Sequence, residues 1–195
     1  MKPHILIPKR LLTIADFFSK EECAAHIARS EGDGYEAATI STKFGAVMRQ
    51  DIRNNARLIC DDAELAQSLW ERVKPFVPSP LFGREAIGLN ERLRYYRYEA
   101  GQVFKAHQDG SFKRENGEKS QITFMVYLNE EFSGGATTFD LRYPYGEMEV
   151  VPKTGMALLF LHSFRHEGAI VTSGSKYVLR SDVMYSAQSS EDDEE

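Results

Sequence analysis

The chain is poor in cysteine and lacks any long hydrophobic run. Its two cysteines, Cys23 and Cys60, have no paired spacing, which excludes a disulfide framework and predicts reduced core residues. The longest apolar run after the N-terminus, residues 156–161, is far shorter than a membrane span. The N-terminal apolar segment is interrupted by a proline and two basic residues at positions 8–10, so it lacks the continuous core of a signal peptide. We therefore expect a cytoplasmic location and no membrane contact.

A surplus of basic residues is also absent. The sequence has 24 lysines and arginines against 29 aspartates and glutamates, which gives a formal net charge of −5. Five of the acids are the last five residues, so the rest of the chain is neutral. A neutral body has no excess charge to neutralise phosphates, which argues against nucleic acid as the main partner. The length of 195 residues fits a single domain, which we place at residues 1–187, with a disordered acidic tail at 188–195.

Two helices are predicted in the first 88 residues. Ser19 and Glu22 have the spacing of a capping box, which predicts a helix that runs to about residue 30 and stops at the glycines that follow. Either Asp61 or Asp62 caps a second helix, whose apolar residues recur at a helical step as far as Val73. Between the two helices we expect a region of strand and loop.

The sequence changes character at about residue 89. From there, short apolar runs alternate with glycine pairs, a pattern typical of an all-β sandwich or barrel. We therefore expect an α+β fold in which an N-terminal helical part, residues 1–88, flanks a β core at residues 89–187. The predicted strands cover residues 93–98, 103–106, 122–128, 137–139, 147–151, 157–162, 168–171 and 177–185.

One short motif places two metal-binding side chains close together. In His107-Gln-Asp109 the outer residues lie two positions apart, so on an extended strand they project from the same face and reach one ion. His166 follows the strongly apolar strand that ends near His162. Two histidines and one carboxylate form the facial triad that binds non-haem iron(II) and leaves positions open for substrate and dioxygen. We favour His166 over His162 as the third ligand, because His162 continues the apolar strand.

Two cations follow on the last predicted strand. Lys176 comes ten residues after His166, and Arg180 comes four residues later on the same face of the strand. A cation buried inside a sandwich needs an anion to make its burial tolerable, and a dicarboxylate co-substrate would supply one. Taken alone, Lys176 could also be a solvated residue at a sheet edge.

The order of these residues resembles the iron(II)- and 2-oxoglutarate-dependent dioxygenases, specifically their prolyl 4-hydroxylase-like branch. The resemblance runs from about residue 89 to residue 185, and the start of the first predicted helix, residues 17–23, is similar as well. The matching features, in chain order, are Arg97-Tyr98, Gly101, Phe104, His107-x-Asp109, Tyr127-Leu-Asn, Gly134-Gly135-x-Thr137, His166-Glu-Gly and Lys176-Tyr177.

The resemblance implies a double-stranded β-helix, or jelly roll, in which His107, Asp109 and His166 bind Fe(II). It also implies that Lys176 binds the distal carboxylate of 2-oxoglutarate. Arg180 lies where related oxygenases sometimes place this cation, so it is either a second anchor or the main one.

Other residues of the motif have less defined roles. Tyr98 and Tyr127 match tyrosines near the co-substrate pocket of the branch, where they could donate hydrogen bonds to 2-oxoglutarate. Each could equally be an aromatic that fills the core. Gly134 and Gly135 are predicted to form a hairpin turn. The resemblance also raises ascorbate as an additional cofactor.

The activity implied is hydroxylation of an unactivated C–H bond by dioxygen, coupled to decarboxylation of 2-oxoglutarate. The substrate expected by analogy is a prolyl or other amino-acid residue in a peptide or protein. The alternatives are a hydroxylase of a free amino acid or small metabolite, a demethylase of nucleic acid, and a catalytically silent jelly-roll module. The neutral charge disfavours the demethylase, and the complete ligand set with two nearby cations disfavours the silent module. The sequence leaves the oligomeric state open.

Overall fold

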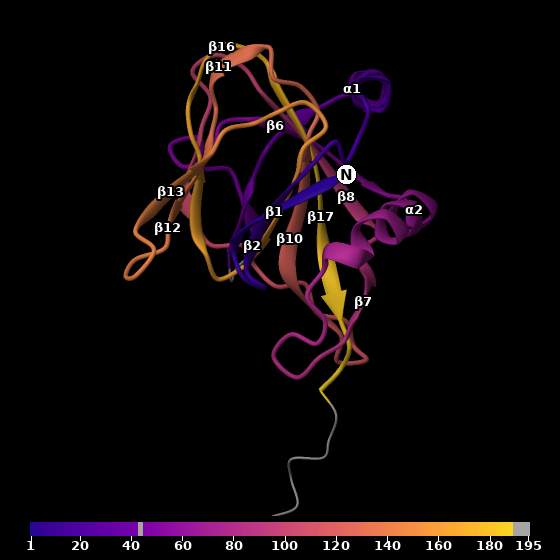
Figure 1. Ribbon diagram of the computed structural model, residues 1–195. Coiled ribbons are helices and arrows are strands. Elements are labelled where there is room, and N and C mark those ends of the chain that lie inside the picture. Colours follow the sequence, from indigo (N-terminus) through magenta and orange to yellow (C-terminus); the bar gives the residue numbers. More distant parts are fainter. Residues whose placement is uncertain (43–44, 189–195) are drawn as a thin grey trace, which may run out of the picture.

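The computed structural model describes residues 1–42 and 45–188, and within them the protein is mostly β-sheet with few helices (Figure 1). The predicted acidic tail lies almost wholly outside the described residues. The helices are α1 (Lys20–Asp33), α2 (Ala63–Val73) and the single 3-10 turn η1 (Lys74–Phe76). The strands are β1 (Lys2–Ile7), β2 (Leu11–Ala15), β3 (Glu36–Ala37), β4 (Ile40–Thr42), β5 (Gly45–Val47), β6 (Ala56–Asp61), β7 (Ala86–Leu89), β8 (Arg92–Tyr98), β9 (Phe104–His107), β10 (Lys119–Tyr127), β11 (Phe132–Gly134), β12 (Thr137–Asp140), β13 (Glu147–Val150), β14 (Ala157–Leu161), β15 (Arg165–Gly168), β16 (Val171–Gly174) and β17 (Lys176–Tyr185).

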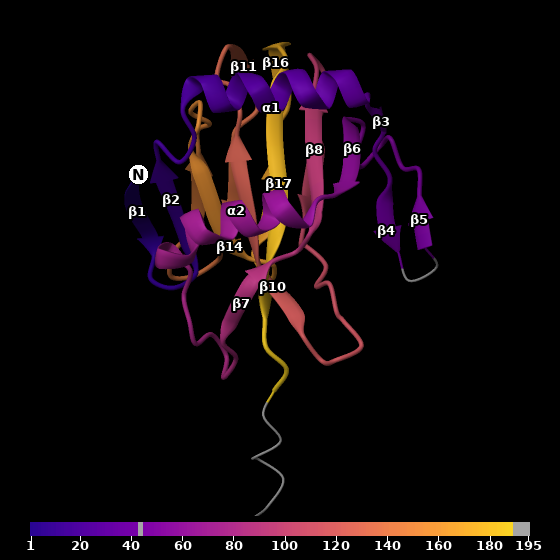
Figure 2. The same cartoon turned by 90° about the vertical axis from the view of Figure 1, so that its right-hand side faces the viewer.

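Two sheets form the body of the molecule. The larger sheet has nine strands in the order β1-β2-β14-β10-β17-β8-β6-β3, with β7 paired to β17. The smaller sheet has four strands in the order β13-β12-β15-β9. Helices α1 and α2 lie over one face of the large sheet (Figure 2), and the small sheet lies over the other (Figure 1).

The alternation of side chains along the central strands explains why the large sheet is covered on both faces. On β10, Ile122, Phe124 and Val126 pack in the core cluster beneath the helices. Met125 and Tyr127, on the opposite face of the same strand, pack in the cluster between the two sheets. A strand buried on both faces has a nearly continuous apolar sequence. This accounts for the apolar runs of β10 and β14.

The helix ends follow from side-chain caps. The Ser19 hydroxyl accepts a hydrogen bond from the amide of Glu22, and the Glu22 carboxylate accepts one from the amide of Ser19, so the predicted capping box is confirmed. Helix α1 runs three residues further than predicted, through Gly32 to Asp33, and ends at Gly34 with φ of 85°. Helix α2 begins after Asp62, whose carboxylate accepts from the amide of Leu65.

The first 88 residues contain more β-structure than predicted. Strands β1, β2, β3 and β6 belong to the large sheet, so the description of this part as helical was too narrow. Strand β6 was missed because its sequence, Ala-Arg-Leu-Ile-Cys-Asp, has a weak alternation, and its pairing with β8 holds it in place.

The predicted strand 168–171 was also wrong. The chain leaves β15 at Gly168 and enters a different sheet at Val171, where β16 pairs with β11.

Gly134 and Gly135 form a different turn from the hairpin predicted. They connect β11, which pairs with β16, to β12, which pairs with β13 and β15. Both have positive φ, 72° and 66°. A Cβ on Gly134 would lie 2.3 Å from the carbonyl oxygen of Ile170, so only glycine fits there.

Two other features of the chain bear on the predictions. Cys23 and Cys60 are both free thiols. Across residues 1–42 and 45–188, no helix is both long and apolar enough to cross a membrane.

Candidate metal centre

His107 and His166 are brought together by the pairing of β9 with β15. The two residues are direct partners in this antiparallel ladder, although they are far apart in sequence, and their ring centroids lie 4.3 Å apart. Asp109 follows β9 by two residues. Its Oδ1 lies 3.7 Å from Nε2 of His107, and its Oδ2 lies 3.7 Å from Nε2 of His166. The three ligand atoms lie within 4.8 Å of one another, close enough to surround one ion.

The two histidines have the same hydrogen-bond arrangement, which leaves one nitrogen of each free. The Nδ1 of His107 lies 2.8 Å from the carbonyl oxygen of Lys105, and the Nδ1 of His166 lies 3.0 Å from that of Phe164. A carbonyl oxygen only accepts, so Nδ1–H donates in both cases. Nε2 then carries the lone pair that binds a metal, and the backbone fixes the orientation of each ring.

The electrostatics of the site favour the protonation states that bind a metal. Burial lowers the pKa of His166 to about 4, so its imidazole is neutral near pH 7. Burial alone would raise the pKa of Asp109, but the charge of Arg180 and the two histidines outweigh it and hold the pKa well below its usual value. Two imidazoles and one carboxylate are a donor set suited to non-haem Fe(II). The residues present therefore fit this metal.

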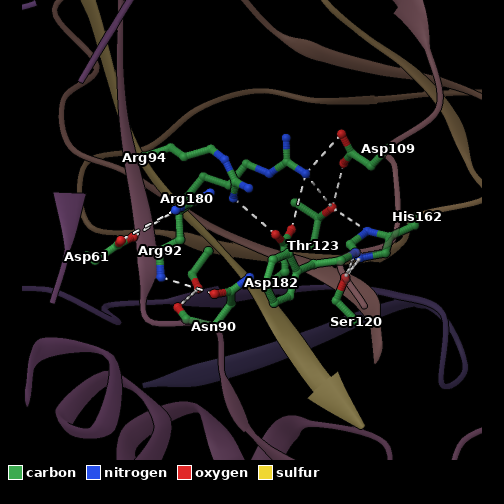
Figure 3. Close-up of polar contacts among 12 residues, drawn as sticks. Asp61, Asn90, Arg92, Arg94, Asp109, Ser120, Thr123, His162, Arg180 and Asp182 are labelled. Atoms are coloured by element: carbon green, nitrogen blue, oxygen red, sulfur yellow. Dashed lines mark hydrogen bonds and ion pairs between the residues drawn. The ribbon is translucent and has the colours of Figure 1, made fainter. Parts of the chain in front are cut away.

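Asp109 is held by two further side chains. Nη2 of Arg180 lies 3.0 Å from its Oδ1, and the hydroxyl of Thr123 donates to its Oδ2 at 2.5 Å (Figure 3). Thr123 was missed at the level of sequence, and so was Asp182, its partner across the β10–β17 ladder. In the sequence, Thr123 stands out as a polar residue inside the apolar run of β10, and this could have indicated a role at the site. Both residues are buried, Thr123 at 1% and Asp182 at 2% exposure. Thr123 contacts Asp109, and Asp182 pairs with Arg180.

His162 is the residue that the sequence left as a rival ligand, and it lies outside the cluster of three. Its Nδ1 lies 3.0 Å from Oγ1 of Thr123, and its Nε2 lies 2.9 Å from Oγ of Ser120 (Figure 3). Because the Thr123 hydroxyl proton is donated to Asp109, Nδ1–H of His162 donates to Thr123 and Nε2 accepts from Ser120. Both ring nitrogens of His162 are therefore engaged, and this histidine supports Thr123 rather than joining the three donors.

Lys176 lies in the narrow cavity beside the three donors. Its side chain is 2% exposed, and Nζ donates to the carbonyl oxygen of Gly135 at 2.5 Å. Nζ also lies over the rings of Tyr98 and Tyr127, at 5.3 and 5.4 Å from their centroids. Among the residues that the structure describes, no carboxylate lies within 4.0 Å of Nζ. Burial lowers its pKa to about 7. Lys176 is thus a buried amine without a carboxylate partner, and a bound anion would favour its charged form.

Arg180 differs from Lys176 in this respect, although both line the same cavity. Its guanidinium pairs with Asp109 at 3.0 Å and with Asp182 at 3.2 Å. Burial would lower its pKa, but the charges of Asp109, Tyr96 and Asp182 raise the pKa further above the ordinary value. The negative charge of two carboxylates is already directed at Arg180, so Lys176 is the cation better placed to receive a new anion.

The two tyrosines singled out by the sequence have different surroundings. Tyr98 lines the cavity with Lys176, and burial raises its pKa to about 12, so it remains a neutral donor. The hydroxyl of Tyr127 lies 2.7 Å from Oγ1 of Thr137, and Tyr127 is completely buried in the core cluster between the sheets. Tyr98 is therefore available to a bound molecule, whereas the hydroxyl of Tyr127 already has a partner.

The fold and the three donors define a class of β-sheet protein with a two-histidine, one-carboxylate centre between its sheets. Residues 93–181 match the family described as the 2OG-Fe(II) oxygenase superfamily. Prolyl 4-hydroxylase 1 of Arabidopsis thaliana is 26% identical over 145 residues, which cover 72% of this chain and 50% of the relative. Prolyl 4-hydroxylase 5 of the same plant is 22% identical over 197 residues, covering 86% and 66%. The chain thus spans about half to two thirds of the length of these relatives.

Solved structures have the same fold. A prolyl-4-hydroxylase of Pseudomonas putida aligns with a TM-score of 0.67 and 18% identity, covering 89% of this chain and 91% of its own. A prolyl hydroxylase in complex with a hypoxia inducible factor peptide fragment from Trichoplax adhaerens aligns with a TM-score of 0.69 and 16% identity, covering 90% and 84%. The chain is thus similar to prolyl 4-hydroxylases along most of its length and, over residues 93–181, to the 2OG-Fe(II) oxygenase superfamily. This family uses Fe(II) and 2-oxoglutarate.

Proposed function

We propose that the protein is an Fe(II)- and 2-oxoglutarate-dependent dioxygenase that hydroxylates a prolyl or other amino-acid residue of a peptide or protein. The observation that carries the proposal is the juxtaposition of His107, Asp109 and His166 with the buried, anion-free Lys176 in one cavity. A metal-binding triad alone fits many reactions. A buried cation beside it predicts a metal-bound co-substrate with a distant carboxylate, which is the shape of 2-oxoglutarate.

Each residue of the site has a proposed role. His107, Asp109 and His166 would hold Fe(II), which with 2-oxoglutarate and dioxygen supplies the oxidising power for C–H hydroxylation. Lys176 would bind the far carboxylate of 2-oxoglutarate. The apolar walls, which include Phe160 and Val178, would exclude water from the reacting groups. In this proposal ascorbate keeps the iron reduced.

The proposal also covers the arrangement of the chain. Residues 89–187 would form the double-stranded β-helix, and the two helices of residues 1–88 would flank it as part of the same domain. The similarity to prolyl hydroxylase structures supports a jelly-roll-like β fold. A cytoplasmic location is part of the same proposal.

A hydroxylase of a free amino acid or other small metabolite is the second candidate. The cavity beside the triad is narrow, and a second, larger groove opens next to it, so a small molecule could also be held there. The neutral charge of the chain continues to disfavour a nucleic-acid demethylase. Lys176 disfavours a catalytically silent module, because a buried cation without an anion costs stability that only a ligand would recover.

The test is a coupled assay on the purified protein with Fe(II), ascorbate, 2-oxoglutarate and a library of proline-containing peptides. We expect succinate to form and a peptide to gain the mass of one oxygen atom. Succinate without any peptide product, together with a free amino acid that gains oxygen, would favour the second candidate. Metal binding without succinate from any mixture would contradict the proposal.

A further inference from the structure

A groove of about 550 Å³ opens beside the metal centre and is lined by arginines. It shares His107, Asp109 and Arg180 with the centre, so a molecule in it reaches the reacting position. One wall comes from residues 39–40 and 52–57, and the other comes from β8, β9, residues 108–112 and β17. The charged side chains that line it are Arg53, Arg57, Arg94, Arg180, Asp109 and Asp182.

The charges of this groove do not balance. Four arginines face two aspartates, before any metal ion adds its own charge. Arg94 pairs with Asp182 at 3.0 Å, and Arg180 takes both aspartates. Arg57 lies 3.5 Å from the carboxylate of Glu36, which is 69% exposed and lies outside the groove. Within residues 1–42 and 45–188, no carboxylate lies within 4.0 Å of the Arg53 guanidinium.

Arg53 is fixed in place without being neutralised. It is only 5% exposed, and its guanidinium lies over the rings of Tyr96 and Phe104, at 4.6 and 4.3 Å from their centroids. Its Nε donates to Oδ1 of Asn55 at 2.7 Å, whereas its Nη2 has no hydrogen-bond partner. Phe104 in turn stacks on His107, with 3.5 Å between ring centroids. A rigid, buried guanidinium with an unused donor therefore stands one aromatic ring away from a proposed metal ligand.

Other unused polar atoms gather in the same groove. Six buried side-chain polar atoms of the described residues lack a hydrogen-bond partner, and four of them belong to residues that line it. These four are on Thr39, Arg53, Arg57 and Arg180, and three of them also lack an ion pair, since Nε of Arg57 is the atom that lies 3.5 Å from Glu36. Buried polar groups are almost always hydrogen-bonded, so their concentration at one place indicates a missing polar partner.

The arginines of the groove change the pKa of Tyr96, which lines it. Burial would raise the pKa of Tyr96, but the positive charges of Arg180, Arg53 and Arg94 outweigh burial and lower it. The hydroxyl of Tyr96, which lines the groove, thus lies in a net positive potential.

We propose that this groove binds a carboxylate of the substrate, with Arg53 as the principal contact. A guanidinium presents two parallel donors that match the two oxygens of a carboxylate. The carboxylate would come from an aspartate or glutamate next to the hydroxylated residue of a peptide, or from the substrate itself when it is a free amino acid. This inference rests on the proposed function, because it names the substrate class of that site.

The test uses the protein loaded with Mn(II) and 2-oxoglutarate, titrated calorimetrically with two matched pairs. The first pair is the end-capped peptide Ala-Glu-Pro-Glu-Ala and its glutamine counterpart, and the second is free L-proline and prolinamide. We expect the carboxylate-bearing member of one pair to bind about tenfold more tightly, which corresponds to about 1.4 kcal/mol. Preference within the first pair assigns the carboxylate to a peptide side chain, and preference within the second assigns it to a free amino acid. Equal affinities in both pairs would overturn the proposal.

Substitutions then assign the preference to the groove. R53Q should reduce the tenfold preference to less than threefold, and R53K, which keeps the charge but loses the paired donors, should give an intermediate value. R142Q removes an arginine from an exposed turn between β12 and β13, so it should keep the full preference. R57Q removes a second groove arginine at a less buried position. If R53Q lowers the melting temperature, R57Q still tests whether the groove arginines cause the carboxylate preference. A preference that survives both R53Q and R57Q would overturn the assignment.

Product analysis separates this inference from the proposed function. With Fe(II) in place of Mn(II), each ligand is examined for the gain of one oxygen atom. Equal hydroxylation of the glutamate and glutamine peptides, with equal affinities, would retain the function and overturn the carboxylate site. A tenfold binding preference lost in R53Q, with no oxygen gained by any ligand, would retain the site and contradict the proposed function.

Discussion

The two faces of the large sheet are built from the same strands and differ completely in what they carry. On β17, Leu179 and Val183 point into the apolar cluster beneath the helices. Lys176, Arg180 and Asp182 occupy alternate positions on the opposite face, toward the small sheet. The helix-covered face is mainly apolar, and the hydroxyls of its Tyr95 and Tyr185 have partners in His26 and Pro78. On the other face, charged groups are either paired with a neighbour or left for a ligand. Stability and chemistry are thus assigned to opposite sides of one strand, and the following substitutions test that division.

The largest effect is expected from the site face. His166→Ala removes one of the three metal donors, so succinate formation should fall below detection. The far-ultraviolet circular dichroism should stay native, because a separate cluster of apolar residues holds the two sheets together. His162→Ala is the matched comparison: it removes a buried histidine that acts on the donors only through Thr123, so succinate formation should fall but stay detectable. Full activity of His166→Ala with loss in His162→Ala would reverse the assignment of the third ligand.

A substitution on the helix-covered face, next in sequence to Thr123, should instead lower the stability of the fold. Phe124 is completely buried beneath the helices, so Phe124→Ala should lower the free energy of unfolding by about 3–5 kcal/mol, measured by urea denaturation. At temperatures where the variant remains folded, its affinity for Mn(II) should match that of the native chain. A loss of metal affinity with unchanged stability would show that the two faces are not independent.

The two cations of β17 should separate in a titration with 2-oxoglutarate. Lys176→Met removes the cation that has no carboxylate, and a charge-assisted contact contributes about 1.5–3 kcal/mol, so affinity should fall roughly ten- to more than a hundredfold. Arg180→Met should act mainly on metal affinity, because Arg180 holds Asp109. A larger loss of 2-oxoglutarate affinity in Arg180→Met would make Arg180 the anchor, and no loss in either variant would remove the co-substrate assignment.

The same lysine gives a pH-dependent stability difference. Burial lowers the pKa of Lys176 from 10.5 to about 7, so between these values the unfolded chain binds a proton that the folded chain does not. Folding is therefore penalised fully below about pH 7, and stability rises as the pH increases from about 7 to about 10.5. The difference in unfolding free energy between Lys176→Met and the native chain should shrink over this range, and a difference that is constant with pH would contradict the lowered pKa.

The smallest expected effect concerns the support of Asp109. Thr123→Val removes the hydroxyl that donates to Asp109 and leaves the strand packing in place, so Mn(II) affinity should fall about tenfold. Thr138→Val on β12 removes a threonine hydroxyl that contacts neither the donors nor the cavity and should leave the affinity unchanged. Equal affinities in the two variants would show that the hydroxyl of Thr123 does not position the carboxylate.

Much of this site could be predicted from the sequence, because its residues lie close together in the chain and alternate along strands. His107 and Asp109 are two positions apart on extended chain, and Lys176 and Arg180 are four apart, so alternation alone predicts that each pair shares a face. The choice of His166 over His162 needed a different argument, from the end of an apolar strand. The structure gives it a physical basis, since β9 pairs with β15 rather than with β14.

The arginine groove could not be predicted in the same way. Arg53 lies in a polar stretch with no periodicity, and nothing near it in sequence marks it as buried. Its position depends on Tyr96 and Phe104, which come from β8 and β9. Strand β6 is a similar case, because its pairing with β8, rather than its own propensity, determines its conformation.

The helix starts, the apolar β core, the metal-binding motif and the two cations on the last strand follow from the sequence alone, because each depends on residues only a few positions apart. Which charged groups neutralise one another depends on how the strands pack in space. Arg180 is paired with Asp109 and Asp182, whereas Lys176 and Arg53 are buried without a carboxylate partner. Electrostatic pairing depends on distance in space, and strands far apart in the chain set that distance through their register.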